Sequence, residues 1–225
     1  MEHMEQIYTD KSFCKLTLNN RILRANDKLA PASLQNWRKI FAGNGESYIN
    51  KDGKTVKLNA LIGIELVEYD KQKQAGQKTG KSIEYNLTPA NINMIVKNID
   101  RSLATDGVLF TDMKTHAYKV NSEGKGEVIF FELKKESTMS NGAKSKYPYA
   151  ITIKKGWAFL REEGVGYDRN SFQNDFYLTV RLSYADICYF FESIKDGIEV
   201  FKLTEGCRLR REGIKYEFEQ LKSKN

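Results

Sequence analysis

The chain has 225 residues, of which 40% are hydrophobic and 29% are charged, and a formal net charge of +7 at pH 7. Its length and apolar content suffice for one large domain or two small ones, and its positive balance favours an anionic partner. Three widely spaced cysteines without a CxxC pair argue against a disulfide framework and predict a reducing, cytoplasmic setting. The first ten residues lack the regions of a signal peptide, and no apolar run reaches membrane-spanning length, so we expect no membrane association.

The first part of the chain is predicted to consist of strands. Residues 13–23 carry alternating apolar positions around an Asn-Asn turn, which predicts a bent strand or a short hairpin. Residues 55–69 predict a long strand, because apolar side chains occupy every second position of most of the segment. Residues 71–81 are basic and almost free of apolar side chains, which is typical of a loop between two strands.

A strand that leads directly into a helix follows this loop. Ile83 and Leu87 belong to an alternating apolar run, Thr88 stands at the N-cap position, and Pro89 occupies the first helical position, where its missing N–H costs nothing. The apolar stripe of the helix comprises Ile92, Ile95, Val96, Ile99 and Leu103.

The second part of the chain repeats this order. Strands are predicted over residues 107–120, 127–135 and 147–160, and a last strand over residues 176–182. Ser183 then caps a second helix, with an acidic residue three positions later as in a capping box. The apolar stripe of this helix comprises Ile187, Phe190, Phe191, Ile194 and Ile198.

A shift of 95 positions (187 − 92) relates the two strands, the two caps and all five stripe positions, which argues for an internal repeat. We expect the same shift to relate residues 55–69 to residues 147–160. The prediction is therefore a single-domain α+β fold of two units, residues 13–105 and 106–201. Each unit is a four-stranded antiparallel sheet followed by a helix, and a C-terminal helical extension covers residues 202–225.

This topology resembles that of the Whirly superfamily and its relatives, the positive-cofactor-four-type coactivators and the purine-rich-element-binding proteins. The resemblance covers residues 13–201 and implies a pseudo-dimer whose two helices pack together in the middle, while the outer faces of the sheets bind single-stranded nucleic acid. No KGKAAL-type signature of the plant Whirly proteins is present, so the resemblance does not imply plant-type assembly into higher oligomers.

Binding of a single strand requires cations along the phosphate backbone and aromatic faces for the bases. Both residue types occur on the predicted strands, on the loops between them, and in a Trp-Arg-Lys triplet. The candidate nucleic-acid-binding residues are Trp37, Arg38, Lys54, Lys57, Lys78, Lys81, Lys134, Lys144, Lys146, Lys154, Lys155, Tyr177 and Arg181. Lysines on a polar strand face are usually only solvated, so the whole set supports this prediction and no single member does. Trp157 continues an apolar alternation and is expected in the core.

An enzyme is the principal alternative. Asp112, followed on the next strand by Glu132 and Lys134, mimics the D…ExK arrangement in which metal-dependent nucleases hold a divalent ion. Glu-x-Lys recurs readily in such a charged chain, and no other catalytic motif is present. A protein-interaction module with an incidental basic surface is the third hypothesis.

The sequence thus predicts a non-catalytic single-stranded DNA-binding protein without a metal or cofactor. Such a protein is expected to act in replication, recombination or transcription, and the Ile/Lys/Asn-rich composition indicates an AT-rich bacterial, phage or plasmid source. RNA as a ligand and assembly into a homo-oligomer are left open.

Overall fold

The computed structural model describes residues 12–43, 47–49, 55–57, 60–74, 77–161 and 166–222, so the candidate residue Lys54 lies outside its described part. Two four-stranded antiparallel sheets dominate the fold, each followed by a helix. The first sheet has the order β1-β2-β5-β6. Its elements are β1 (Ser12–Thr17), β2 (Arg21–Lys28), β5 (Leu61–Tyr69) and β6 (Thr79–Leu87), and it leads into α1 (Pro89–Arg101).

The second sheet has the order β10-β9-β8-β7, so that β10 lies at its edge. Its elements are β7 (Gly107–Val120), β8 (Gly126–Lys135), β9 (Tyr149–Ala158) and β10 (Gln173–Leu182), and it leads into α2 (Tyr184–Lys222). Smaller elements are the strand pair β3 (Ser47–Ile49) and β4 (Thr55–Lys57), and the 3-10 helices η1 (Leu34–Asn36), η2 (Ser102–Ala104) and η3 (Arg169–Ser171). The predicted α+β fold class of two sheet-plus-helix units is confirmed.

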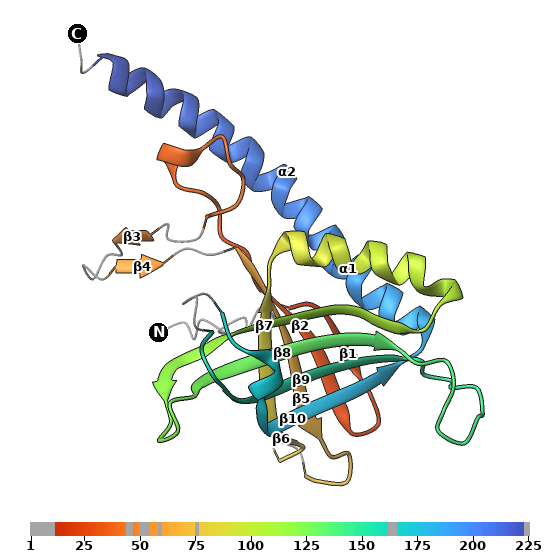
Figure 1. Ribbon diagram of the computed structural model, residues 1–225. Coiled ribbons are helices and arrows are strands. Elements are labelled where there is room, and N and C mark those ends of the chain that lie inside the picture. The colour runs from red at the N-terminus through yellow and green to blue at the C-terminus, as the bar shows by residue number, and fades with distance from the viewer. Residues whose placement is uncertain are drawn as a thin grey trace.

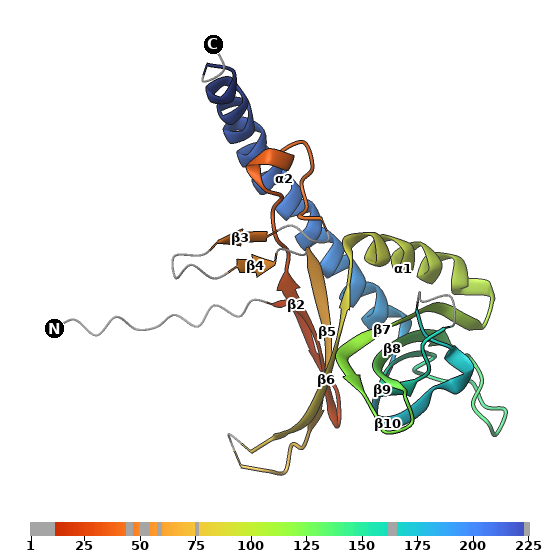
Figure 2. The same ribbon diagram turned by 60° about the vertical axis from the view of Figure 1, so that its left-hand side comes forward.

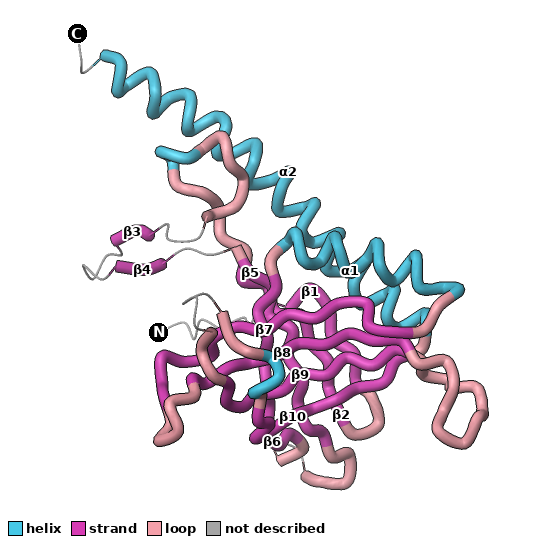
Figure 3. Tube along the Cα trace, viewed as in Figure 1, coloured by secondary structure: helices cyan, strands magenta, loops and turns pink. Residues whose placement is uncertain are grey.

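The apolar faces of the two sheets pack directly against each other. Figures 1 and 3 show the strands of one sheet running across those of the other, and the ring centroids of Tyr85 on β6 and Phe131 on β8 lie 5.5 Å apart in the core between them. The helices α1 and α2 contact each other at one end of the sheets (Figure 2). The expected arrangement, with both helices in the middle, is therefore wrong, because the sheets bury their apolar faces on each other.

The 95-residue repeat is confirmed at the start of each helix. Thr88 and Ser183 both form capping boxes, with Asn91 and Asp186 respectively, so that side chain and backbone of the two partners exchange hydrogen bonds. The first four stripe positions of each helix are buried. The fifth pair differs, because α1 ends at Arg101 and leaves Leu103 62% exposed.

The 95-residue shift also relates β6 to β10, but it does not hold for β5 and β9. Leu87 on β6 and Leu182 on β10 are equivalent by the 95-residue shift. Leu87 pairs with Ile62 on β5, and Leu182 pairs with Tyr149 on β9, so the offset between β5 and β9 is 87 residues (149 − 62). The β9–β10 connection and ladder are longer than those between β5 and β6. The predicted strand over residues 55–69 is also divided, since residues 55–57 pair with β3. Ladder hydrogen bonds, which sequence spacing does not report, decide the equivalence of strands.

The helix α2 is one continuous helix of 39 residues, not an apolar segment followed by a separate helix. It spans roughly 58 Å at about 1.5 Å per residue, and its C-terminal part extends beyond the sheets (Figure 1). No helix in the described residues combines the length and the apolar character needed to cross a membrane.

The segment of residues 30–43 lies along this extension and packs into it at glycines. A Cβ atom built on Gly213 would lie 2.1 Å from Cγ of Trp37, whereas one on Gly206 would lie 3.6 Å from Ile40. Phe41 stacks on Phe201 with ring centroids 5.6 Å apart. Gly213 thus provides the space in which Trp37 packs against α2.

We predict opposite effects for alanine at these two glycines. Both substitutions raise helix propensity by up to about 1 kcal/mol, but Gly213→Ala also forces the indole away from the helix, which costs about 1–3 kcal/mol. Chemical denaturation should show Gly206→Ala at or above wild-type stability and Gly213→Ala below it. Equal stability of the two variants would contradict the proposed packing.

Candidate nucleic-acid interface

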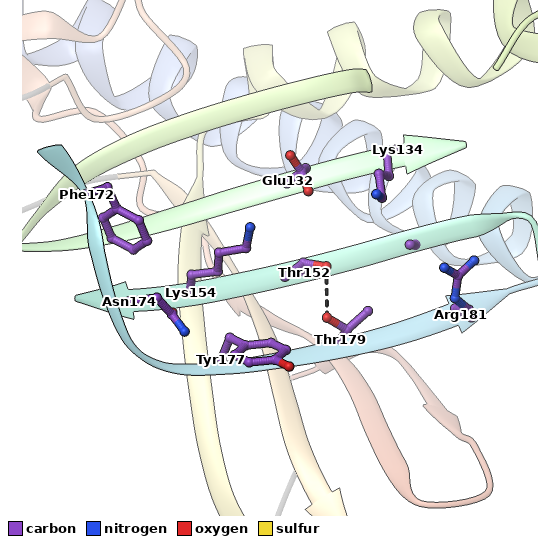
Figure 4. A pocket seen from close by; sticks show the side chains of 10 residues that line it. Glu132, Lys134, Thr152, Lys154, Phe172, Asn174, Tyr177, Thr179 and Arg181 are labelled. Atoms are coloured by element: carbon purple, nitrogen blue, oxygen red, sulfur yellow. Dashed lines mark hydrogen bonds between the residues drawn. The ribbon is translucent and has the colours of Figure 1, made fainter. Parts of the chain in front are cut away.

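The outer face of the second sheet carries a shallow hollow of about 430 Å³ over β8, β9 and β10, named here the β8–β10 hollow (Figure 4). Alternate residues of these strands point to opposite faces, so Ile151 and Ile153 enter the core while Thr152 and Lys154 face outward. The lining residues are Glu132, Lys134, Ala150, Thr152, Lys154, Phe172, Asn174, Tyr177, Thr179 and Arg181.

Strand register arranges these side chains in three rows across the sheet. The first row is Phe130, Lys154 and Tyr177, one from each strand. Lys154 Nζ lies 5.5 Å from the centroid of the Phe130 ring, and Tyr177 is 57% exposed. Phe172 extends the aromatic side, with its ring centroid 6.2 Å from that of Phe130. Lys154 therefore stands in register between two aromatic residues, and its ammonium lies over the ring of Phe130.

The second row is polar and the third is cationic. Glu132, Thr152 and Thr179 form the second row, in which the two threonine hydroxyls hydrogen-bond at 2.9 Å. Lys134 and Arg181 form the third row on either side of Ala150, whose small side chain keeps the floor low. The hollow thus presents an aromatic end and a cationic end. The polar row lies between them, two residues along the strands from each.

Glu136 ties the two cations of the third row together. Its carboxylate lies 2.6 Å from Lys134 Nζ and 2.8 Å from Arg181 Nη2. Hydrogen bonds from the Lys134 ammonium, and after it from the Arg181 guanidinium, hold the pKa of Glu136 below its ordinary value. At neutral pH this carboxylate is ionised and competes for both cations with any anionic ligand.

The outer face of the first sheet has a different chemistry. Its corresponding row is Arg24, Glu65 and Glu84, and Asn26 donates hydrogen bonds to both carboxylates, at 3.3 and 2.9 Å. Lys28 pairs with Glu84 as well. The charged groups of this row are therefore already engaged with one another, and the two outer faces are not equivalent as the repeat had suggested.

Four of the candidate residues from the sequence come together in the hollow, namely Lys134, Lys154, Tyr177 and Arg181. Lys155 does not join them, because it faces the other side of β9 and pairs with Glu127 at 2.8 Å. That assignment to the outer face is wrong, since neighbouring residues of a strand project to opposite faces.

The remaining candidates lie elsewhere. Arg38 is on the α2 side, where its guanidinium lies 2.6 Å from Glu217 and over the ring of Trp37. Lys81 Nζ lies 5.5 Å from the ring of Phe176 on the inner side of β10. Lys57 is in β4, with its side chain outside the described part. The other three are on loops: Lys78 between β5 and β6, and Lys144 and Lys146 in the hairpin between β8 and β9.

Sequence reasoning missed Phe130, Phe172 and Asn174. Phe130 could have been found, because it alternates with the core residue Phe131 and therefore shares a face with Lys134. Trp157, expected in the core, is partly exposed and donates a hydrogen bond to Asp175 at 2.8 Å. Phe172 and Asn174 come from the β9–β10 connection and the irregular start of β10, for which the sequence carries no periodic signal.

The nuclease-like residues do not assemble. Asp112 pairs across the ladder with the core residue Phe131, whereas Glu132 pairs with Thr111 on the outer face. Cross-strand partners share a face, so the two carboxylates lie on opposite sides of the sheet and cannot hold one ion. Asp112 instead pairs with Lys114 at 3.3 Å. Within the described residues, no group of three or more His, Cys, Asp or Glu side chains could hold a metal ion.

No family model and no curated protein matches the sequence. Three solved structures similar to this chain are Whirly proteins, the group that the predicted topology resembles. WHY3 from Arabidopsis thaliana is 7% identical, with a TM-score of 0.48 and coverage of 94% of this chain and 96% of that one. WHY1 from the same plant is 9% identical, with a TM-score of 0.45 and coverage of 91% and 90%. The plant transcriptional regulator PBF-2 is 10% identical, with a TM-score of 0.43 and coverage of 91% and 86%. At this level of identity and superposition, none of them assigns a ligand to this chain.

Proposed function

We propose that this protein is a non-catalytic single-stranded DNA-binding protein and that the strand lies in the β8–β10 hollow. The row formed by Phe130, Lys154 and Tyr177 carries this proposal, because it combines an ammonium group over one aromatic ring with a second, exposed aromatic ring on the adjacent strand. Bases stacked on such faces contribute about 1–3 kcal/mol each, and the cation neutralises phosphate. Stacking on a sheet surface requires unpaired bases, which favours a single strand over a duplex.

The cationic row provides a second phosphate position. Lys134 and Arg181 flank Ala150, two residues along the strands from the polar row. Threonine hydroxyls between the two ends, and the Asn174 amide at the aromatic end, offer hydrogen bonds without a fixed base pattern. Binding is therefore largely tolerant of sequence. The proposal includes a cytoplasmic setting in replication, recombination or transcription of a bacterial, phage or plasmid genome, supported by three free thiols and the Ile/Lys/Asn-rich composition.

Oligo-dT binding tests the hollow. Tyr177→Ala should weaken binding by about 1–3 kcal/mol through loss of a stacked base. Lys154→Gln should lower the slope of log K against log salt by about 0.7, the contribution of one phosphate contact to a single strand. Lys97→Gln, on the exposed side of α1, is the matched control and should behave as wild type. Fluorescence anisotropy at two salt concentrations measures all three, and oligo-rU in place of oligo-dT tests RNA.

Two results would replace this function with another. Absence of oligo-dT binding at low salt would leave the basic surface incidental and favour a protein-interaction module. Cleavage of labelled DNA with Mg²⁺ or Mn²⁺, abolished in Glu132→Ala, would restore the nuclease hypothesis in spite of the opposed carboxylates.

Neutralising Glu136 should strengthen binding. Glu136→Gln releases Lys134 and Arg181 for phosphate, so we expect oligo-dT affinity to rise about two- to fivefold, the range of an exposed ion pair. Glu192→Gln, which removes the partner of Lys195 on α2, is the matched control and should leave affinity unchanged. A loss of affinity in Glu136→Gln would mean that the carboxylate positions the two cations for the ligand.

We also propose a homo-oligomer formed through the C-terminal part of α2. This helix is apolar on two opposite sides, one covered by residues 30–43 and the other open. Val200, Cys207, Ile214 and Leu221 recur at seven-residue intervals, the spacing of a helix-to-helix seam. The exposed apolar side chains of the open side are Val200 59%, Leu203 69%, Ile214 53%, Phe218 58% and Leu221 63%. A second copy of the same helix is self-complementary to such a stripe.

Light scattering after gel filtration tests this assembly. The wild-type protein should run as a dimer or larger at micromolar concentration, and Ile214→Glu should shift it to the monomer because a charge enters the seam. Leu103→Glu replaces a leucine that is 62% exposed outside the stripe and should not change the mass. A monomeric wild-type protein would contradict the proposal.

A further inference from the structure

The β8–β10 hollow does not end at the edge of its sheet. Thr179 and Arg181 on the edge strand β10 also line a second depression, together with Tyr147 and the turn that joins β1 to β2. Figure 4 shows this turn, in red, beyond β10 on the side of Arg181. The first unit thus supplies a wall to the binding face of the second.

The surface continues from there onto the first unit. The turn residues Asn19, Asn20 and Arg21 line this second depression and also a third one, formed with Lys71 and Lys73 of the β5–β6 loop. Because each depression shares residues with the next, the three form one connected path from the second sheet to the β5–β6 loop.

We propose that a single strand bound in the hollow continues along this path, over the β1–β2 turn, with its phosphates at Arg21 and the β5–β6 loop. This inference rests on the proposed function and extends its site to a second unit of the chain. The path repeats the chemistry of the hollow, since Tyr147 is 44% exposed and Lys146 Nζ lies 5.5 Å from its ring. It therefore offers a second platform for a base.

The charged side chains along the path favour binding of an anion. Neither Arg21, Lys71 nor Lys73 forms an ion pair within the described part of the chain, in contrast to Lys134 and Arg181. Beyond the hollow, three carboxylates also line the path, and each accepts a hydrogen bond from a neighbouring group. Asp186 accepts from the Ser183 hydroxyl, Glu68 from the Lys81 amide, and Asp70 from the Gln72 amide. These carboxylates keep their charge, but the cations Arg21, Lys71, Lys73 and Lys78 outnumber them four to three.

The spacing sets the length of ligand that can use both platforms. Tyr177 lies five residues before Leu182 on β10, and Tyr147 precedes Tyr149, the ladder partner of Leu182. Five residues of strand span about 17 Å, so Tyr147 lies beyond the far end of the hollow from Tyr177 and a ligand needs more than one nucleotide to reach both platforms. A very short oligonucleotide can occupy the hollow alone, whereas a longer one reaches the turn.

The test compares two lengths of oligo-dT, of about 4 and about 16 nucleotides, which bracket the known site sizes of single-strand modules. Arg21→Gln should weaken binding of the longer oligonucleotide and lower its salt slope by about 0.7, with no effect on the shorter one. Tyr147→Ala should weaken binding of the longer one by about fivefold or more through a lost stack. Lys97→Gln is again the control, and thermal unfolding confirms that each variant is folded.

The outcomes separate the two proposals. Failure of the wild-type protein to bind either oligonucleotide would overturn the proposed function. Normal wild-type binding with Arg21→Gln and Tyr147→Ala both indistinguishable from Lys97→Gln would overturn only the extended path. Equal loss for both lengths in Arg21→Gln would also overturn it, because the arginine would then act within the hollow. If the wild-type protein binds only the longer oligonucleotide measurably, that oligonucleotide alone tests the extended path. Unchanged affinity and salt slope in Arg21→Gln would then overturn it.

Discussion

Direct contact between the apolar faces of the two sheets is the constraint on which the rest of this structure depends. Tyr85 and Phe131 meet in the core between the sheets, so neither sheet uses a helix to cover its whole inner face. The helices are thereby confined to one end. Because each sheet contributes one face to this core, the alternation of every strand turns a second set of side chains outward, mostly polar but with apolar members such as Ile22, Val67 and Phe130. The candidate interface follows from this arrangement.

The two exposed faces have diverged in what they can bind. On the first sheet, Arg24, Glu65 and Glu84 satisfy one another, and Gly63 leaves room for the Glu84 carboxylate, which lies where a Cβ atom would otherwise be. On the second sheet, the row equivalent to this one contains Thr152 and Thr179, and the neighbouring row presents Phe130, Lys154 and Tyr177. A row whose charges are already paired gains little free energy from binding an anion, whereas an unpaired lysine beside aromatic rings gains more. The two units thus present outer faces of different chemistry, and the second carries the proposed interface.

The long helix α2 joins the sheets to the surface proposed for assembly. Its N-terminal part is buried at the end of the sheets, and its C-terminal part extends past them with Trp37 packed at Gly213 on one side and an apolar stripe on the other. Arg38 and Trp37, chosen from the sequence as nucleic-acid contacts, hold the segment of residues 30–43 to this helix in the structure. Aromatic and basic neighbours in a sequence thus indicate packing as readily as binding.

Local rules determined much of this protein from its sequence alone. Capping residues Thr88 and Ser183 and the apolar stripes behind them specified both helices, because these signals act within a few residues. Alternation placed Tyr177 and Arg181 on the polar face of the last strand for the same reason. Only the tertiary structure decided that β5 matches β9 with an offset of 87, that Asp112 and Glu132 face apart, and that Arg21 borders β10. Those relations depend on ladder register and sheet packing between distant segments, which no local pattern encodes.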